Sequence, residues 1–144
     1  MFIRDLLKNQ ATVSAEVHQT VLEVAGMMVS RKIGAVPVLR NGQLVGIFTE
    51  RDLMSRVVVA GKDPARTPVG EVMTADPLTI EPKDNVETCM ALMRRHAFRH
   101  LLVCEAGVLK GVVSLRDVLL HDLDEKDDEV RMMRAYLHSA PDAG

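Results

Sequence analysis

Along this chain, a segment whose apolar residues have helical spacing is followed by short strand-like apolar runs. The whole arrangement occurs twice. Val21, Val24 and Met28 lie near helical spacing and predict a helix. The same spacing recurs from Val86 to Met93 and predicts a second helix of similar length.

Two short apolar runs follow each predicted helix. In the first copy the runs are separated by Asn41-Gly42, a dipeptide that strongly favours a two-residue hairpin turn. In the second copy the turn is Ala106-Gly107. The runs themselves are residues 35–39 and 43–48, then residues 100–104 and 108–113. Each half of the chain therefore predicts an antiparallel hairpin.

Further elements complete each half in the order β-α-β-β-α. Short extended pieces open the halves at residues 11–14 and 77–80, and second helices close them at residues 50–60 and 115–123. Helical pieces outside the repeated pattern are predicted at residues 3–7, 69–72 and 124–138. Gly, Lys, Asp and two Pro make residues 61–68 a linker by composition.

The two halves align without a gap at an offset of 65 residues. Of the 44 pairs formed by residues 13–56 and 78–121, nine are identical. They include Gly46 with Gly111 and Asp52 with Asp117. Glycines and a charged residue kept in place indicate a tandem duplication of one structural unit.

Composition narrows the class of protein. The chain has 144 residues, of which 47% are apolar and 26% charged, as in ordinary globular proteins. The net charge of −2 offers no broad basic surface, which disfavours nucleic acid as a main partner. The charged N-terminus is unlike a signal peptide, and no run approaches the roughly 18 apolar residues of a membrane span. Cys89 and Cys104 lie far from any CxxC motif, which favours buried free thiols and a cytoplasmic location.

Two motifs stand where a strand ends and a helix begins. Thr49-Glu-Arg-Asp52 and Ser114-Leu-Arg-Asp117 each place a hydroxyl residue three positions before an aspartate. This pattern is typical of a helix cap. It also suits a ligand. The backbone N–H groups of an exposed helix start favour anions, and a carboxylate can accept hydrogen bonds from both hydroxyls of a ribose. Both interpretations stay open at this point.

Taken together, these features resemble a pair of CBS domains, named after cystathionine β-synthase. The resemblance covers residues 1–123, and it draws support from IGAVPV at Ile33, RHLLV at Arg99 and VMTADPLTI at Val72. It implies an α/β (α+β) fold with two β-α-β-β-α units packed sheet to sheet around a pseudo-twofold axis. The implied divisions are residues 1–60 (first unit with an N-terminal helix), 61–68 (linker), 69–123 (second unit) and 124–144 (C-terminal helix and tail).

The resemblance also implies a function and a ligand. Members are regulatory or sensor modules in signal transduction, such as energy sensing, rather than enzymes. Their clefts commonly bind AMP, ADP or ATP, and sometimes NAD(H) or S-adenosylmethionine. None of these acts as a catalytic cofactor. Relatives often form flat dimers, so a cytoplasmic homodimer is expected, and the exposed apolar face of the tail should contribute to it.

The family assigns roles to residues at matching positions. Ribose and phosphate would be bound by Thr49, Asp52, Ser114, Asp117, Arg99 and His100. The adenine pocket would be formed by Val13, Ile33, Gly34, Pro37, Leu78 and Phe98. Because Arg99-His100 replaces Gly34-Ala35 in the second copy, the two sites are expected to be unequal. Leu102 replaces the proline found at Pro37, so the backbone there is expected to pair differently.

Other functions fit the sequence less well. His96 and His100 are four residues apart, but the repeat places them on different elements, and no third metal ligand is suitably spaced. A flavodoxin-type enzyme would need parallel strands with helical crossovers, which the hairpins oppose. A dimerising scaffold with vestigial nucleotide sites remains the alternative function.

Overall fold

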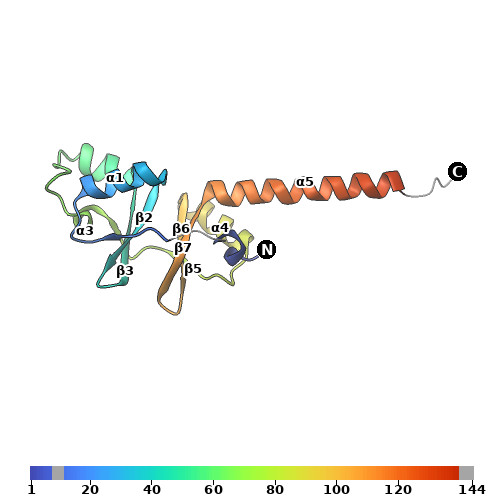
Figure 1. The fold of residues 1–144 in the computed structure, drawn as a ribbon, viewed down its shortest axis with the longest axis horizontal. Helices are drawn as coiled ribbons and strands as arrows, with labels where there is room; N and C mark the ends of the chain where they lie inside the picture. Colours follow the sequence, from blue (N-terminus) through green and yellow to red (C-terminus); the bar gives the residue numbers. More distant parts are fainter. Residues whose placement is uncertain (8–11, 140–144) are drawn as a thin grey trace.

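The structure is a computed structural model that describes residues 1–7 and 12–139. Two small sheets lie next to each other in the middle of the molecule, with α1 (Val21–Arg31) and α3 (Val69–Val72) on one side and α4 (Val86–His96) on the other (Figure 1). The first sheet has the order β1-β2-β3-β4 and the second β5-β6-β7. The strands are β1 (Ala15–Glu16), β2 (Ala35–Arg40), β3 (Gln43–Thr49), β4 (Thr74–Ala75), β5 (Thr79–Ile80), β6 (His100–Glu105) and β7 (Val108–Ser114). The predicted β-α-β-β-α order of both halves is confirmed.

Equivalent helices of the two units begin and end in the same way. Thr20 accepts a hydrogen bond from the backbone at the start of α1, and Asn85 does so at the start of α4. Lys32 and Ala97, which the repeat aligns, both end their helices in the left-handed conformation, with φ of 55° and 56°. The duplication therefore preserved the local conformation as well as the apolar positions.

Both predicted hairpins are confirmed. Asn41 and Gly42 have φ of 50° and 80°, and Ala106 and Gly107 have φ of 50° and 79°. Two successive residues with positive φ are the signature of the type I′ turn, whose twist matches that of the strands. Strand β2 pairs with β3, and β6 with β7, in antiparallel register.

The first strand of each unit differs from its prediction. Residues 12–14 are not in a strand, Ala11 lies outside the described residues, and β1 begins only at Ala15. In the second unit β5 covers Thr79–Ile80 alone.

Pro37 gives a physical reason for the difference between the two first strands. Thr79 of β5 pairs with Leu102 in the second sheet, whereas no residue of β1 pairs with Pro37, the equivalent of Leu102, in the first. Proline has no backbone N–H to donate, so pairing in the first sheet starts one residue later, at Ala15 with Val38. The expected difference in pairing at Leu102 is therefore present.

The two closing helices differ from their predictions in different ways: the first is less regular, and the second is longer. In the first unit, α2 (Glu50–Asp52) continues as a π-helix, η2 (Leu53–Val58). In the second, α5 runs without interruption from Leu115 to Ser139 and extends away from the rest of the molecule (Figure 1). The predicted start of a separate tail helix at residue 124 is wrong, because no Gly or Pro between residues 115 and 139 ends the first helix.

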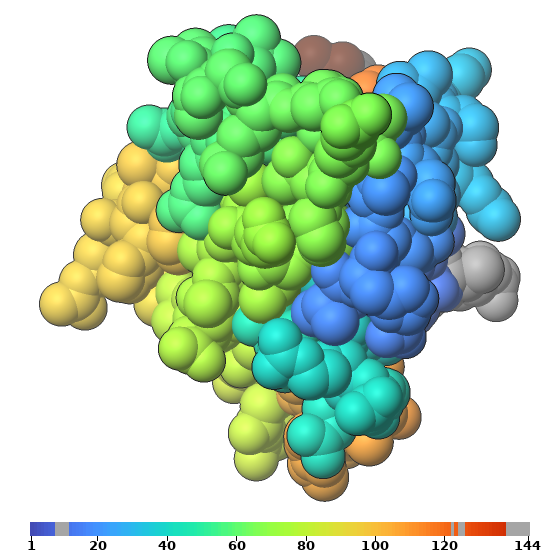
Figure 2. Space-filling model, turned by 90° about the vertical axis from the view of Figure 1, so that its left-hand side faces the viewer, coloured from blue at the N-terminus to red at the C-terminus, as the bar shows by residue number. Residues whose placement is uncertain are grey.

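Two short segments pack against the unit to which they do not belong in sequence. The 3-10 helix η1 (Ile3–Leu7) lies on the second unit, where Ile3 is fully buried and its N–H donates to Asp84 O at 2.8 Å. Segment α3, which follows the linker, lies on the first unit, where the Val69 N–H donates to Gln19 O at 2.7 Å. In Figure 2 the lime-green segment with α3 accordingly lies against the blue start of the first unit.

Glycines in the last strand of each unit give these exchanged segments room. A Cβ on Gly46 would lie 2.9 Å from Thr74 O, and a Cβ on Gly111 would lie 2.8 Å from a methyl group of Leu7. Both glycines therefore permit a close approach of chain to chain. In the described residues, the last-strand glycine of each unit is therefore a point of tight packing.

Three apolar clusters form the core. One lies within each unit, and Phe48 and Leu101 are among their largest fully buried side chains. A third cluster joins the two sheets and consists of Ala35, Ile47 and Leu102, with Leu44, Leu109 and Val112 packed against it. Ile47 with Val112 and Leu44 with Leu109 are repeat equivalents, so the sheets meet through matching faces, as the predicted pseudo-twofold packing requires.

The two cysteines differ in burial. Cys89 is fully buried in the second core, and this burial raises the pKa of its thiol to about 11. Cys104 is only half-buried, so the prediction of two buried thiols is right for one of them.

Across the described residues, no helix is both long and apolar enough to cross a membrane. The cytoplasmic location stays a prediction.

Candidate functional site

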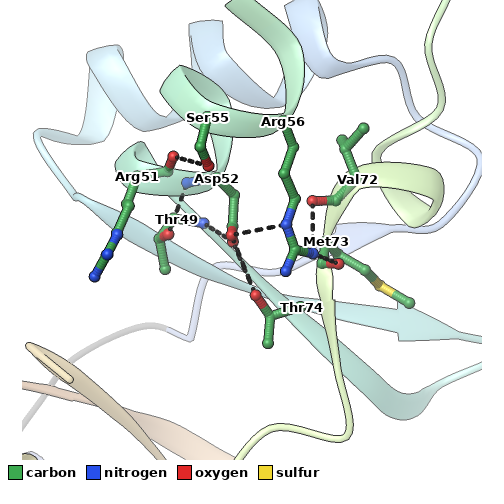
Figure 3. A network of polar contacts seen from close by, with 8 residues as sticks. All are labelled: Thr49, Arg51, Asp52, Ser55, Arg56, Val72, Met73 and Thr74. Atoms are coloured by element: carbon green, nitrogen blue, oxygen red, sulfur yellow. Dashed lines mark hydrogen bonds and ion pairs between the residues drawn. The ribbon is translucent and has the colours of Figure 1, made fainter. Parts of the chain in front are cut away.

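The Thr49-Glu-Arg-Asp52 motif forms a complete capping box at the start of α2. The Thr49 side chain accepts from the Asp52 N–H at 3.2 Å, and the Asp52 carboxylate accepts from the Thr49 N–H at 3.0 Å. Asp52 is only 7% exposed and has two further partners, the hydroxyl of Thr74 and the guanidinium of Arg56 (Figure 3). Its carboxylate is therefore enclosed by protein groups.

The second motif forms the same cap with fewer partners. The Ser114 hydroxyl accepts from the Asp117 N–H at 3.1 Å, and Asp117 Oδ2 accepts from the Ser114 N–H at 3.3 Å. Asp117 is half-buried. The cap interpretation is thus right for both motifs, and it leaves one oxygen of Asp117 available for another role.

A group of side chains from both units converges near the start of β6, and we call Gly34, Glu50, His100 and Asp117 the cross-unit cluster. A Cβ on Gly34 would lie 3.2 Å from Glu50 Oε1 and 3.5 Å from His100 Cε1. His100 is half-buried, and Asp117 is close enough to influence its charge. The cluster therefore brings together three predicted site residues and Glu50, across the contact between the units.

The electrostatics of the cluster centre on His100. Burial lowers the pKa of His100 below its ordinary value of 6.5, and the positive charge of Arg99 acts in the same direction. The carboxylates of Glu50 and Asp117 oppose this shift. An imidazole with a lowered pKa is mainly neutral near pH 7, and a nearby anion would favour its protonated form.

The backbone next to the cluster is built in the same way in both units. Glu50 N–H donates to Gly34 O at 3.0 Å, and Leu115 N–H donates to Arg99 O at 2.7 Å. These equivalent bonds fix the start of each closing helix against the start of β2 or β6. The side chain of Arg99 is exposed beside the cluster.

The predicted adenine-pocket residues are spread over several environments. Pro37 is buried in the first sheet, and Val13 and Leu78 are half-buried against the first and second cores. Ile33 lines an open cavity of about 310 Å³ together with Glu50 and residues of α1 and η2. Phe98 is 43% exposed and stacks on His96, with ring centroids 5.4 Å apart. Their role in binding adenine stays a prediction.

Sequence reasoning did not single out Glu50, Arg56 or Thr74. Glu50 stands inside the repeated motif, where the second copy has Leu115, and this difference was its only signal. Thr74 reaches Asp52 only because β4 pairs with β3, and local sequence carries no sign of that pairing. Within the described ranges, no three His, Cys, Asp or Glu side chains gather in a group that could hold a metal ion.

Comparison with known proteins places these features in a family. The CBS-domain family model matches residues 3–59 and again residues 69–124. The CBS domain-containing protein YhcV of Bacillus subtilis is 34% identical over 86% of this chain and 87% of its own length.

Solved structures agree with this assignment. A CBS-domain-containing protein of Agrobacterium tumefaciens superimposes with a TM-score of 0.79 at 34% identity, covering 85% of this chain and 99% of the other. A CBS domain protein of Pyrobaculum aerophilum, determined as a complex with AMP, superimposes with a TM-score of 0.76 at 29% identity, covering 84% and 97%. The repeated β-α-β-β-α unit, the sheet-to-sheet contact and both family matches lead to one conclusion: this chain belongs to the CBS-domain family, as a tandem pair of CBS domains.

Proposed function

We propose that this protein is a regulatory module that binds an adenosine nucleotide in the cleft between its two CBS units. The observation that carries the proposal is the cross-unit cluster, in which Gly34, His100 and Asp117 meet across the contact between the units. The AMP complex of the Pyrobaculum aerophilum relative supports an adenine nucleotide as the ligand class.

Each part of the cluster suits one part of a nucleotide. The half-buried Asp117 carboxylate can accept hydrogen bonds from ribose hydroxyls, and Ser114 lies beside it. His100 and the exposed Arg99 suit a phosphate, with a protonated imidazole donating and a guanidinium binding two oxygens. Gly34 lets the Glu50 and His100 side chains come close together, because a side chain at this position would contact both. Val13, Ile33 and Pro37 are the apolar residues assigned to the base, with Leu78 and Phe98 as their counterparts in the second unit.

Signalling follows from where such a ligand would bind. A nucleotide held by residues of both units binds best to one relative position of the units and shifts the population toward it. AMP, ADP, ATP, NAD(H) and S-adenosylmethionine share the adenosine that this site would recognise. The role is therefore regulatory, and no step of it requires catalysis.

Ligand-dependent thermal unfolding tests the proposal. At a concentration 100 times its dissociation constant, a nucleotide bound only by the folded protein adds about 2.7 kcal/mol to the free energy of unfolding. For a chain of this size, the melting temperature should rise by about 5–10 °C. The measurement is differential scanning fluorimetry with AMP, ADP, ATP, NADH and S-adenosylmethionine, followed by calorimetry of the tightest ligand. An unchanged melting temperature with all five would reject the sensor function.

Self-association of the chain is favoured by a specific surface on α5. Four exposed residues form a stripe along one side of this helix, which we call the tail stripe: Leu123, Val130, Met133 and Leu137. The helix is acidic at Asp127, Asp128 and Glu129 and basic at Arg131 and Arg134. Two copies packed antiparallel would bury both stripes and place acidic segments beside basic ones. We therefore propose a homodimer in which the tails pair. Such a dimer is compatible both with a nucleotide sensor and with a scaffold whose nucleotide sites are vestigial.

Glutamate substitutions on two sides of the helix test the dimer. Met133→Glu places a charge in the tail stripe and should convert a dimer into a monomer, as measured by light scattering at high micromolar concentration. Met132→Glu is the matched control, because Met132 is similarly exposed but lies about 100° around the helix from Met133 and outside the tail stripe. A wild-type monomer at that concentration, or equal effects of both variants, would contradict tail pairing.

A further inference from the structure

The two aspartates of the repeat differ in how fully their oxygens are used. Asp52 Oδ2 accepts from the Thr49 N–H at 3.0 Å, and Asp52 Oδ1 accepts from the Thr74 hydroxyl at 3.1 Å. Arg56 Nε lies 3.8 Å from the same Oδ1. Asp52 thus binds protein groups through both oxygens and is nearly inaccessible to solvent.

The partners of Asp52 come from the exchanged segment after the linker. Thr74 lies in β4, which pairs with β3 through Ile47. Arg56 also donates to Met73 O at 2.6 Å, so it ties the same segment to η2 (Figure 3). Asp52, Arg56 and residues 72–74 form one network whose evident role is to hold the exchanged segment on the first unit.

Asp117 has no comparable network. Its side chain accepts only from the Ser114 N–H, and the structure gives it no other hydrogen bond or ion pair anywhere in residues 1–7 and 12–139. It is half-buried, and it lies in the cross-unit cluster close to His100. One carboxylate oxygen of Asp117 is therefore available to a ligand without the loss of a protein contact.

We infer that the chain binds one adenosine nucleotide through Asp117, and that Asp52 is a structural residue whose cleft takes no ribose. This inference rests on the proposed function. A ribose at Asp52 would have to displace the Thr74 hydroxyl from a charged acceptor, which weakens binding by about ten- to hundredfold. The same ribose at Asp117 displaces nothing. The duplication thus kept the aspartate in both units and gave it two different tasks.

Calorimetric titration with AMP separates the two aspartates. Wild-type protein should bind one AMP per chain. Asp117→Asn should weaken AMP binding by about thirtyfold with little change in melting temperature, because asparagine still accepts at the cap. Asp52→Asn is the matched variant, and it should leave the affinity within about twofold while lowering the melting temperature. Removal of the 2′-hydroxyl from AMP should weaken binding to the wild type, and equal affinities would overturn the ribose role of Asp117.

Amide chemical shifts of the wild-type protein provide a test that needs no variant. During an AMP titration, the amide signals of Ser114 and Asp117 should move, whereas those of Thr49 and Asp52 should stay. Two equal AMP sites per chain, or an equal loss of affinity in Asp52→Asn and Asp117→Asn, would overturn this inference and leave the proposed function standing. No response of the wild-type protein to AMP or the other nucleotides would reject both.

Discussion

Replacing Leu102 with alanine should lower the free energy of unfolding by about 2–5 kcal/mol. Leu102 is fully buried where the two sheets meet, and it forms an apolar cluster there with Ala35 and Ile47. The truncated side chain would leave a cavity between the units, because the sheets cannot close over it without moving the hairpins. Urea unfolding followed by circular dichroism measures the loss.

A second measurement on this variant connects packing to function. A cavity between the units should also loosen the cross-unit cluster and weaken AMP binding. Leu101→Ala is the matched control, since Leu101 is the neighbouring leucine of β6 and is buried within the second unit instead. The control should lose similar stability and keep its AMP affinity. A Leu102→Ala protein that loses under 1 kcal/mol would show that the sheets do not depend on this contact.

Replacing Ile3 with alanine should cost about 2–5 kcal/mol as well, although Ile3 is near the start of the chain. Terminal residues usually contribute little, yet Ile3 is fully buried in the core of the second unit. Its loss should destabilise that unit more than the first, which native-state hydrogen exchange resolves residue by residue. Leu22→Ala is the control, because Leu22 is 57% exposed on α1. Equal stabilities of the two variants would mean that the N-terminal segment is not docked.

Local patterns were sufficient to predict most of the repeated unit. The Asn41-Gly42 turn, the apolar spacing of α1 and the hydroxyl residue before each final helix all act through neighbours in sequence. Each therefore has the same effect wherever the unit lies, and the duplication doubled the signal. The family resemblance rests on the same features.

The features that escaped prediction depend on contacts between distant segments. Nothing near Thr74 in sequence indicates that β4 will pair with β3 and bring its hydroxyl to Asp52. The start of β1 was misplaced because Pro37 limits pairing on the neighbouring strand. The two aspartates look equivalent in sequence, and only tertiary structure distinguishes an enclosed carboxylate from an available one.

The exchange of the short segments has a consequence for the order in which the protein matures on the ribosome. Ile3 is made first, but the core that receives it is complete only once Val118 has been added. At roughly 5–20 residues per second, this interval is about 6–25 s. The first unit waits in a similar way for Val69 and Val72. The first core is therefore complete in the nascent chain before the second, and Ile3 can dock only after the second core has been made.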